Sequence, residues 1–249
     1  MEKSNIGEKI KLLTGSGMWH TREAEGLPSV HLSDGPHGLR KQEEKERQNN
    51  VSLVSTCYPT ASALACSWDV TAAERLGRAV AKEAWNADVA VLLGPGINMK
   101  RSPLCGRNFE YFSEDPFLAG RLGAAYVSAA QGEDVAVSLK HFAANNQETN
   151  RQTANSQIDE RALREIYLSA FEYVVKTARP ATIMASYNRL NGYYACENRH
   201  LLTEILREEW GFDGVVISDW GACADLAKAV KAGMDLEMPD SHGIHARKL

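Results

Sequence analysis

One carboxylate in this chain follows a run of residues that all suit a buried strand. Residues 215–218 read VVIS, and Asp219, Trp220 and Gly221 follow directly. A short apolar, β-branched run bounded by turn signals is typical of a strand covered on both faces. A carboxylate at the carboxyl end of such a strand lies where α/β barrels hold their reactive side chains. We therefore interpret Asp219 as a nucleophile.

Further polar side chains lie where other strands are expected to end. They are an acid, two arginines, a lysine, a histidine and a phenol: Asp34, Arg107, Lys140, His141, Arg151 and Tyr187. In a barrel the strand ends meet on one face, so these side chains would surround Asp219. Nearby positive charge favours an ionised carboxyl group, and an ionised aspartate can attack an anomeric carbon. The cations are also donors for neutral sugar hydroxyls, and Trp220 offers an apolar surface to a pyranose ring.

Taken singly, these residues allow other interpretations. Asp34 precedes a Gly-Pro pair and could be a turn residue that bonds its own backbone. Lys140 could form a Schiff base with a carbonyl substrate, which borohydride would trap. His242 and His245 have no partners at metal-ligand spacing, so no metal site is predicted. The prediction of a sugar site rests on the whole set.

The composition excludes several classes of protein. The chain has 28 Lys plus Arg against 32 Asp plus Glu, and its net charge of −4 argues against a nucleic-acid partner. An unbroken apolar run of about eighteen residues, as a membrane span requires, occurs nowhere, and residues 1–17 lack the apolar core of a signal peptide. Five cysteines without a CxxC pair predict no disulfide framework. Buried free thiols in the cytoplasm are the expectation.

The elements that must position these side chains alternate between strand and helix. Strands are predicted from Val30 and at 89–93, 135–139, 181–186, 215–218 and 235–239, with a doubtful one near 53–58. Helices are predicted at 4–13, 60–65, 70–85, 116–131, 160–176, 198–210 and 223–232, and 41–50 as a solvated loop. Their expected N-caps include Ser4, Asp69 or Thr71, an acid at 114–115, and Asp159. No GxGxxG follows the first strand, so a (β/α)8 TIM-like barrel, possibly incomplete at its C-terminus, is favoured over a doubly wound sheet.

Several long motifs occur in a characteristic order. They are SDGPHGLR (33–40), GRNFEYFSEDP (106–116), KHFAANNQETNR (140–151), SYNRLNG (186–192), LREEWGFDGVVISDW (206–220) and AGMDLEMP (232–239). Through them the chain resembles glycoside hydrolase family 3 over nearly its whole length. The resemblance implies a single barrel domain over residues 1–249, with no cofactor.

The resemblance also implies an activity and assigns roles to residues. The activity is retaining hydrolysis of terminal non-reducing β-D-glycosidic bonds, in a β-linked oligosaccharide or an aryl or alkyl glycoside, with Asp219 as the nucleophile. The family's sugar-binding residues correspond to Asp34, Arg107, Lys140, His141, Arg151 and Tyr187, with Met184 and Trp220 also near its pocket.

The loop after the Lys-His pair distinguishes branches of the family. Members that cleave β-N-acetylhexosamine carry KHFPGHG, whereas this chain reads KHFAANNQE and resembles the β-glucosidase and β-xylosidase branch. In that branch the general acid/base is a glutamate of a second, α/β sandwich domain, which is absent from this chain. Because retaining hydrolysis needs two carboxyl groups about 5 Å apart, we expect a fragment of a larger enzyme. The alternatives are a sugar-binding barrel without catalytic activity and β-xylosidase specificity.

Overall fold

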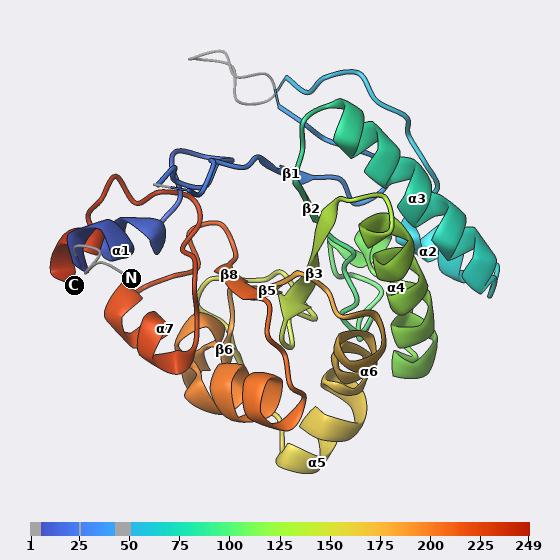
Figure 1. Ribbon diagram of the computed structural model, residues 1–249. Coiled ribbons are helices and arrows are strands. Elements are labelled where there is room, and N and C mark those ends of the chain that lie inside the picture. Colours follow the sequence, from blue (N-terminus) through green and yellow to red (C-terminus); the bar gives the residue numbers. More distant parts are fainter. Residues whose placement is uncertain (1–5, 25, 43–50) are drawn as a thin grey trace.

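A parallel sheet of five strands forms the centre of the chain (Figure 1). The computed structural model describes residues 6–24, 26–42 and 51–249. The strand order is β1, β2, β3, β5, β8, with bounds Leu32–Asp34, Val91–Leu93, Ala136–Phe142, Thr182–Ala185 and Val215–Ser218. Helices lie between successive strands along the chain, which confirms the predicted α/β class.

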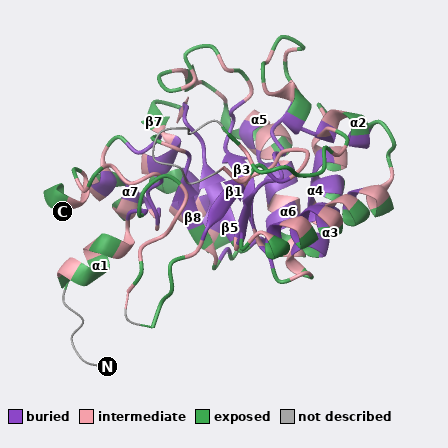
Figure 2. Cartoon of the chain, turned by 90° about the horizontal axis from the view of Figure 1, so that it is seen from above, coloured by how far each residue is buried: buried purple, intermediate pink, exposed green. Residues whose placement is uncertain are grey.

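Both faces of this sheet are apolar, as the unbroken hydrophobic runs in its strands require. Side chains that alternate along each strand divide between two clusters. The inner cluster is the smaller one and consists of Leu32, Val91, Leu93, Met184, Ile217, Leu236 and Met238. Their neighbours Leu92, Ile183 and Val216 belong to the larger outer cluster under the helices. The strands are accordingly the most deeply buried part of the chain (Figure 2).

Single backbone bridges extend the sheet beyond β8. Ile217 pairs in parallel with Leu236, and Glu237 pairs in parallel with Thr14. His20 then pairs with His31, which precedes β1. The predicted strand at 235–239 is therefore attached by bridges on both sides and does not form a full ladder. The described residues hold five strands of this sheet, and closure into an eight-stranded barrel stays a prediction.

Helices cover the outer face of the sheet. The helical segments are α1 (Ile6–Leu12), α2 (Ala61–Ala65), α3 (Val70–Asn86), η1 (Asn108–Glu110), α4 (Pro116–Gln131), α5 (Glu160–Ala162), η2 (Leu163–Tyr167), α6 (Ser169–Ala178), η3 (Ala195–Glu197), η4 (His200–Glu209), α7 (Leu226–Ala232) and η5 (Ala246–Lys248). Helix α4 packs between α3 and α6 (Figure 1). Gly77 allows the close approach of α3, because a Cβ there would lie 2.5 Å from the carbonyl oxygen of Tyr126. Among the described residues, every helix is too short or too polar to cross a membrane.

A second, three-stranded sheet joins two loops at the carboxyl ends of the central strands. It consists of β4 (Asn155–Ser156), β6 (Arg189–Leu190) and β7 (Tyr193–Tyr194). Strand β4 lies in the loop after β3, and the β6–β7 hairpin follows β5. This small sheet fixes the loop that carries Arg151 beside the one that carries Tyr187.

Several predicted boundaries hold and others shift. Asp69, Asp115 and Asp159 cap their helices as expected. Residues 53–58 form no strand; several of them are exposed, so no sheet face is available to bury them. The last of the predicted helices, α7, begins at Leu226 rather than at residue 223, because Asp225 is its N-cap. Only Cys196 and Cys223 of the five free cysteines are buried. The predicted cap Ser4 and most of the loop at 41–50 lie outside the described residues.

The cap at Asp159 provides a test of local helix energetics. Its Oδ1 accepts a hydrogen bond of 2.9 Å from the backbone N–H of Ala162. We expect Asp159→Ala to lower the stability by about 1 kcal/mol, since that N–H loses its partner, and the melting temperature by roughly 2–4 °C. Asp159→Ser, which preserves a cap, should melt within about a degree of the wild type. Equal melting temperatures for the two variants would contradict the assignment.

Candidate active site

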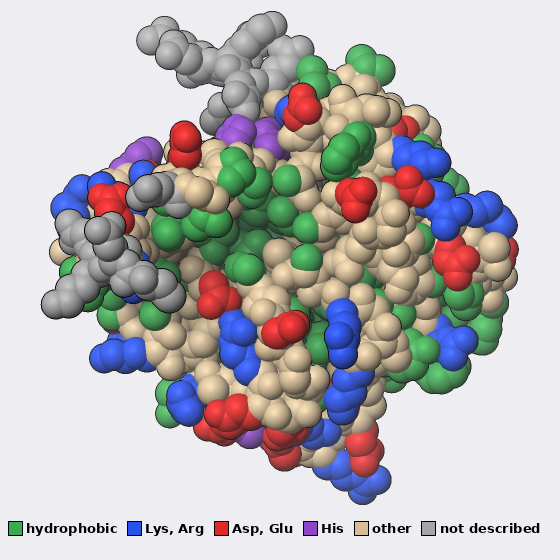
Figure 3. All heavy atoms as spheres, viewed as in Figure 1, with side chains coloured by type: hydrophobic (Ala, Val, Ile, Leu, Met, Phe, Trp, Pro, Cys, Tyr) green, Lys and Arg blue, Asp and Glu red, His purple; other side chains and the backbone are tan. Residues whose placement is uncertain are grey.

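A cavity of about 200 Å³ opens at the carboxyl ends of the central strands. It is lined by all nine residues predicted from the sequence and by one further aromatic residue: Asp34, Arg107, Lys140, His141, Arg151, Met184, Tyr187, Asp219, Trp220 and Trp19. In the view of Figure 1, hydrophobic side chains gather near the middle of the molecular face and charged side chains lie below them (Figure 3). The parallel strands bring these residues together, because their carboxyl ends share one edge.

Asp219 is buried and has one carboxylate oxygen without a partner. Its Oδ1 accepts a hydrogen bond of 2.8 Å from the backbone N–H of Trp220. Its Oδ2 has no hydrogen-bond partner among the described residues. Burial raises the pKa of Asp219 above its ordinary value, while Arg107, Lys140, the Trp220 N–H and Arg151 oppose that rise. The side chain is thus held by one oxygen while the other remains available for chemistry.

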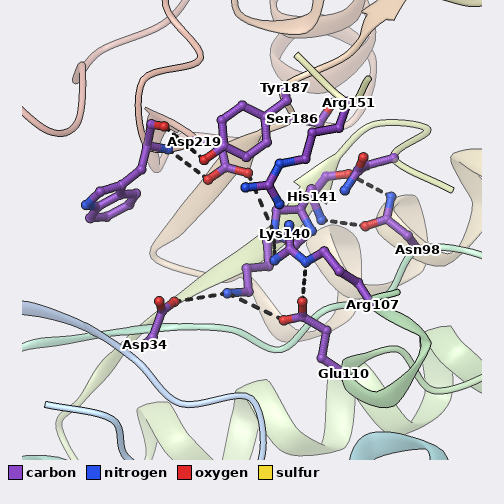
Figure 4. A network of polar contacts seen from close by, with 12 residues as sticks. Asp34, Asn98, Arg107, Glu110, Lys140, His141, Arg151, Ser186, Tyr187 and Asp219 are labelled. Atoms are coloured by element: carbon purple, nitrogen blue, oxygen red, sulfur yellow. Dashed lines mark hydrogen bonds and ion pairs between the residues drawn. The ribbon is translucent and has the colours of Figure 1, made fainter. Parts of the chain in front are cut away.

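His141 lies beside this carboxylate (Figure 4). Its Nε2 is 2.7 Å from Arg107 Nη2, and its Nδ1 is 2.9 Å from the Tyr111 hydroxyl. An arginine can only donate, so Nε2 must accept and Nδ1 must carry the proton. Burial, and then Arg107, Lys140 and Arg151, lower the pKa of His141 well below its ordinary value. The separation of 3.7 Å between His141 Nε2 and Asp219 Oδ2 is therefore not an ion pair.

Backbone contacts fix the position of His141. Asn98 accepts a hydrogen bond of 2.7 Å from the His141 N–H and donates one of 2.8 Å to the His141 carbonyl. Asn98 is buried and follows β2. Asn98 thus pairs with both backbone polar groups of His141. It holds the end of β3 in place beyond Val137, where the hydrogen-bonded ladder to β2 ends.

An ion-pair network surrounds the floor of the cavity (Figure 4). Lys140 Nζ lies 3.3 Å from Asp34 Oδ1 and 3.8 Å from Glu110 Oε2. The other oxygen of Glu110 pairs with Arg107 Nε. Lys140 and Glu110 are each about nine-tenths or more buried, at 3 % and 4 % exposed. One buried carboxylate thus compensates two cations of the site.

Arg151 and Tyr187 form the side of the cavity nearest Asp219 (Figure 4). The Arg151 guanidinium stands 4.4 Å from the centre of the Tyr187 ring, and its Nη1 is 2.8 Å from Glu148 Oε2. Tyr187 donates its hydroxyl to the carbonyl of Trp220 at 2.8 Å. Burial, and then the charge of Asp219, raise the pKa of Tyr187, so it stays a neutral donor.

Two tryptophans form the apolar wall. The rings of Trp19 and Trp220 lie 5.3 Å apart, and Trp220 Nε1 donates to the Met18 carbonyl at 2.8 Å. Trp19 Nε1 donates to Gln42 Oε1 at 3.1 Å. Both rings pack against the inner cluster, of which Met184 is a member. A sugar ring in this cavity would meet aromatic surface on one side and charged donors on the other.

Two residues of the site were not predicted from the sequence. Trp19 reaches the cavity through the bridge that joins His20 to His31, which no sequence pattern marks. Glu110 stands three residues after Arg107 inside a cluster of aromatic residues. The sequence marks Glu110 and Arg107 together as suited to a sugar and its hydroxyls, but it does not show that Glu110 is buried in ion pairs. Opposite charges at i and i+3 are the pattern that indicates such a pair.

A larger cavity lies away from these residues, between α2 and the start of α4. It measures about 440 Å³, and Lys100 projects into it with its Nζ 2.5 Å from Ser62 Oγ. Burial lowers the pKa of Lys100. None of the strand-end residues reaches this cavity, so we place the chemistry in the smaller one.

The fold and the smaller cavity together define an α/β domain with a polar cavity at the carboxyl ends of its parallel strands. The chain belongs to glycosyl hydrolase family 3. Residues 36–247 match the model of the family's N-terminal domain.

Individual relatives agree with this assignment. The chain is 52% identical over 253 residues to thermostable beta-glucosidase B of Acetivibrio thermocellus, a match that covers 100% of the chain and 34% of that protein. It is 50% identical over 242 residues to an exo-alpha-(1->6)-L-arabinopyranosidase of Bifidobacterium longum, covering 95% of the chain and 32% of that protein. The crystal structure of a beta-glucosidase from Kluyveromyces marxianus in complex with glucose is 42% identical and superposes with a TM-score of 0.94, covering 99% of the chain and 29% of that one. The chain thus spans about a third of the length of its relatives.

Proposed function

We propose that this chain supplies the nucleophile and the sugar-binding residues of a retaining β-glycosidase. The observation that supports the proposal is the free Oδ2 of Asp219, which borders a cavity of about 200 Å³ among cations. Sites for drug-sized ligands usually measure about 300–1,000 Å³, so this cavity suits a single sugar unit.

The reaction proceeds in two displacements. Asp219 Oδ2 attacks the anomeric carbon, the bond to the leaving oxygen breaks, and a glycosyl-enzyme ester forms. The ester is then hydrolysed by water, which restores the carboxylate. A general acid must protonate the leaving oxygen in the first step, and the same group must deprotonate the water in the second. The short Trp220 N–H bond orients Asp219 throughout.

The remaining residues bind the sugar. Asp34 can accept a hydrogen bond from one sugar hydroxyl, and Lys140 can donate to an adjacent one, because the two side chains lie 3.3 Å apart. Arg151 and the neutral His141 lie closer to Asp219, beside the position of the anomeric carbon (Figure 4). The negative charge of Asp219 stabilises the positive charge that develops on the sugar in the transition state. Trp220 and Trp19 supply the surface for the apolar face of the ring.

The general acid is best assigned to a part of the protein outside this chain. Among the described residues, the only other carboxylate that lines the cavity is Asp34, and Lys140 holds it in an ion pair. The relatives are about three times as long as the matched region. We infer that a glutamate in a second domain completes the site.

The substrate we favour is a terminal β-D-glucoside. Two of the three relatives described above are named as beta-glucosidases, and the third acts on an arabinopyranoside. A pentopyranoside, either this sugar or the xyloside, lacks the hydroxymethyl group on the ring. Rates of labelling with matched hexose and pentose reagents would separate the two classes of substrate.

The proposal is tested by covalent trapping. The chain is incubated with a 2-deoxy-2-fluoro-β-glucoside that bears a dinitrophenolate leaving group, which departs without protonation, so the missing acid is not needed. We expect an intact mass increased by one fluoroglucosyl unit, located by peptide mapping to Asp219. A chain that melts cooperatively and binds glucose without forming the ester would instead be a sugar-binding domain, which is the second candidate function.

The pH dependence of trapping follows from the burial of Asp219. Only the ionised carboxylate attacks, and burial raises the pKa of this group above its ordinary value of 3.8. The trapping rate should therefore fall as the pH is lowered, with a midpoint above 3.8, while cooperative melting shows that the chain remains folded. A rate that stays constant down to about pH 4 would show that the attacking group is not a buried carboxyl.

We further propose that the protein resides in the cytoplasm. Cys57 and Cys66 are exposed free thiols, and oxidising compartments seldom keep such groups reduced. Fractionation of the source cells with an antibody to the chain would test the location.

A further inference from the structure

A second group of reactive side chains lies behind the nucleophile loop. Cys223, Glu237 and His245 offer a thiol sulfur, a carboxylate oxygen and an imidazole nitrogen that all lie within 4.8 Å of one another. We propose that these three residues bind a divalent transition-metal ion, with Zn²⁺ as the best-suited cation. The proposal is independent of the glycosidase reaction, because none of the three lines the sugar cavity.

The set of donors selects the kind of cation. A thiolate, an imidazole and a carboxylate are the ligands of tetrahedral zinc sites, whereas Ca²⁺ and Mg²⁺ take oxygen ligands. Three protein donors leave one position for water. Bonds of about 2.0–2.3 Å to one centre place two ligand atoms at most about 4.6 Å apart, so small side-chain movements would bring donors that lie within 4.8 Å of one another onto one ion.

The backbone holds two of the donors in place without any ion. The N–H of Glu237 donates to the Leu13 carbonyl at 2.8 Å, and the Glu237 carbonyl accepts from Gly15 at 3.0 Å. Cys223 lies in the loop after β8, where Gly221 takes a left-handed φ of +80°. Its neighbour Ala222 donates to the Asp219 carbonyl at 2.9 Å. A bound ion would therefore tie the loop that carries the nucleophile to the segment at 237–245.

The third donor lies on the open side of the group. The His245 side chain is 21% exposed, whereas that of Glu237 is 4% exposed. His245 Nδ1 stands 2.5 Å from Glu237 Oε1, and Ser241 donates to the other Glu237 oxygen at 3.3 Å. These are the only described partners of a deeply buried carboxylate. Burying a carboxylate is costly, and one histidine and one hydroxyl offset that cost only in part, so a bound cation would stabilise Glu237 further.

Metal binding here must release protons. A cysteine binds zinc as the thiolate, so the Cys223 sulfur must lose its proton. When the ion binds, the S–H bond breaks, the sulfur–metal bond forms and the proton goes to the buffer. The affinity should therefore increase as the pH rises.

The experiment is a calorimetric titration of the metal-free 249-residue chain with ZnCl₂. We expect one equivalent to bind, with an enthalpy that varies with the ionisation heat of the buffer, and an increase in melting temperature. Cys223→Ser and His245→Ala should each weaken binding at least about tenfold. The matched controls are Cys57→Ser, an exposed thiol, and His242→Asn, an exposed histidine three residues away whose φ of +54° asparagine tolerates.

A measurement on the wild-type chain keeps the test independent of the folding of the variants. Co²⁺ should produce a thiolate-to-metal charge-transfer band in the near ultraviolet, and Zn²⁺ should protect Cys223 from alkylation by iodoacetamide in peptide mapping. Absence of the band, alkylation of Cys223 unaffected by Zn²⁺, or equal binding by the Cys57→Ser and Cys223→Ser chains would each overturn the proposal. The group would then be a buried hydrogen-bonded pair beside a thiol.

Discussion

Replacing Asp219 with alanine should abolish formation of the covalent glycosyl adduct. The free oxygen of this side chain is the only described carboxylate oxygen in the cavity that is buried and has no partner. We expect the trapping rate to fall by at least about a thousandfold, or roughly 4 kcal/mol in the barrier. Sugar binding should persist, because Arg107, Lys140 and Arg151 keep their other contacts. The measurement is the intact mass as a function of time.

A suitable control for this variant lies six residues upstream. Asp213 is an exposed aspartate with no part in the cavity, so Asp213→Ala should be labelled at the wild-type rate. A decrease of less than about tenfold in Asp219→Ala, equivalent to 1.4 kcal/mol, would show that another group attacks. A loss of glucose binding in parallel with trapping would instead identify Asp219 as a binding residue.

Replacing Glu110 with glutamine should destabilise the chain more than any other substitution of a single charge in the site. Glu110 pairs with both Arg107 and Lys140 and is 4 % exposed. Removal of one member of a buried ionic group leaves the others uncompensated, at a cost of about 3 kcal/mol or more. For a chain of this size the melting temperature should fall by roughly 6–12 °C. Thermal melting followed by circular dichroism measures the effect.

The matched control for Glu110 is the exposed Glu114, four residues later. Glu114→Gln should shift the melting temperature by less than about 2 °C, because exposed charges contribute little. If Glu110→Gln shifts the melting temperature as little as Glu114→Gln does, then the charge of Glu110 is not needed to stabilise the buried Arg107 and Lys140. Glu110→Asp keeps the charge but shortens the side chain, so its melting temperature should lie between those of Glu110→Gln and Glu114→Gln.

Much of the local structure was determined by sequence patterns alone. The β-branched run before Asp219 forms β8, and the acid before each amphipathic segment caps a helix at Asp69, Asp115 and Asp159. These predictions succeed because they depend on neighbours a few residues apart: alternation along a strand, or a carboxylate beside free N–H groups at a helix start. The polar strand ends also predicted seven of the ten residues that line the cavity, because parallel strands bring their carboxyl ends to one edge. Trp220 was predicted as an apolar surface for the sugar, and Met184 was implied by the family resemblance.

Only the tertiary structure decided which partner each polar group has. The pairing of Glu110 with Lys140 and the proton on His141 Nδ1 depend on residues about thirty positions away along the chain. Trp19 enters the cavity through one backbone bridge, and His245 meets Cys223 across the loop after β8. No spacing rule identified His245 as a ligand, because a pairing of this kind is set by the packing of segments and not by periodicity. Local propensity thus determined the strands and helices. Long-range packing determined which charged side chains pair, which nitrogen of His141 carries the proton, and which residues surround the Cys223 thiol.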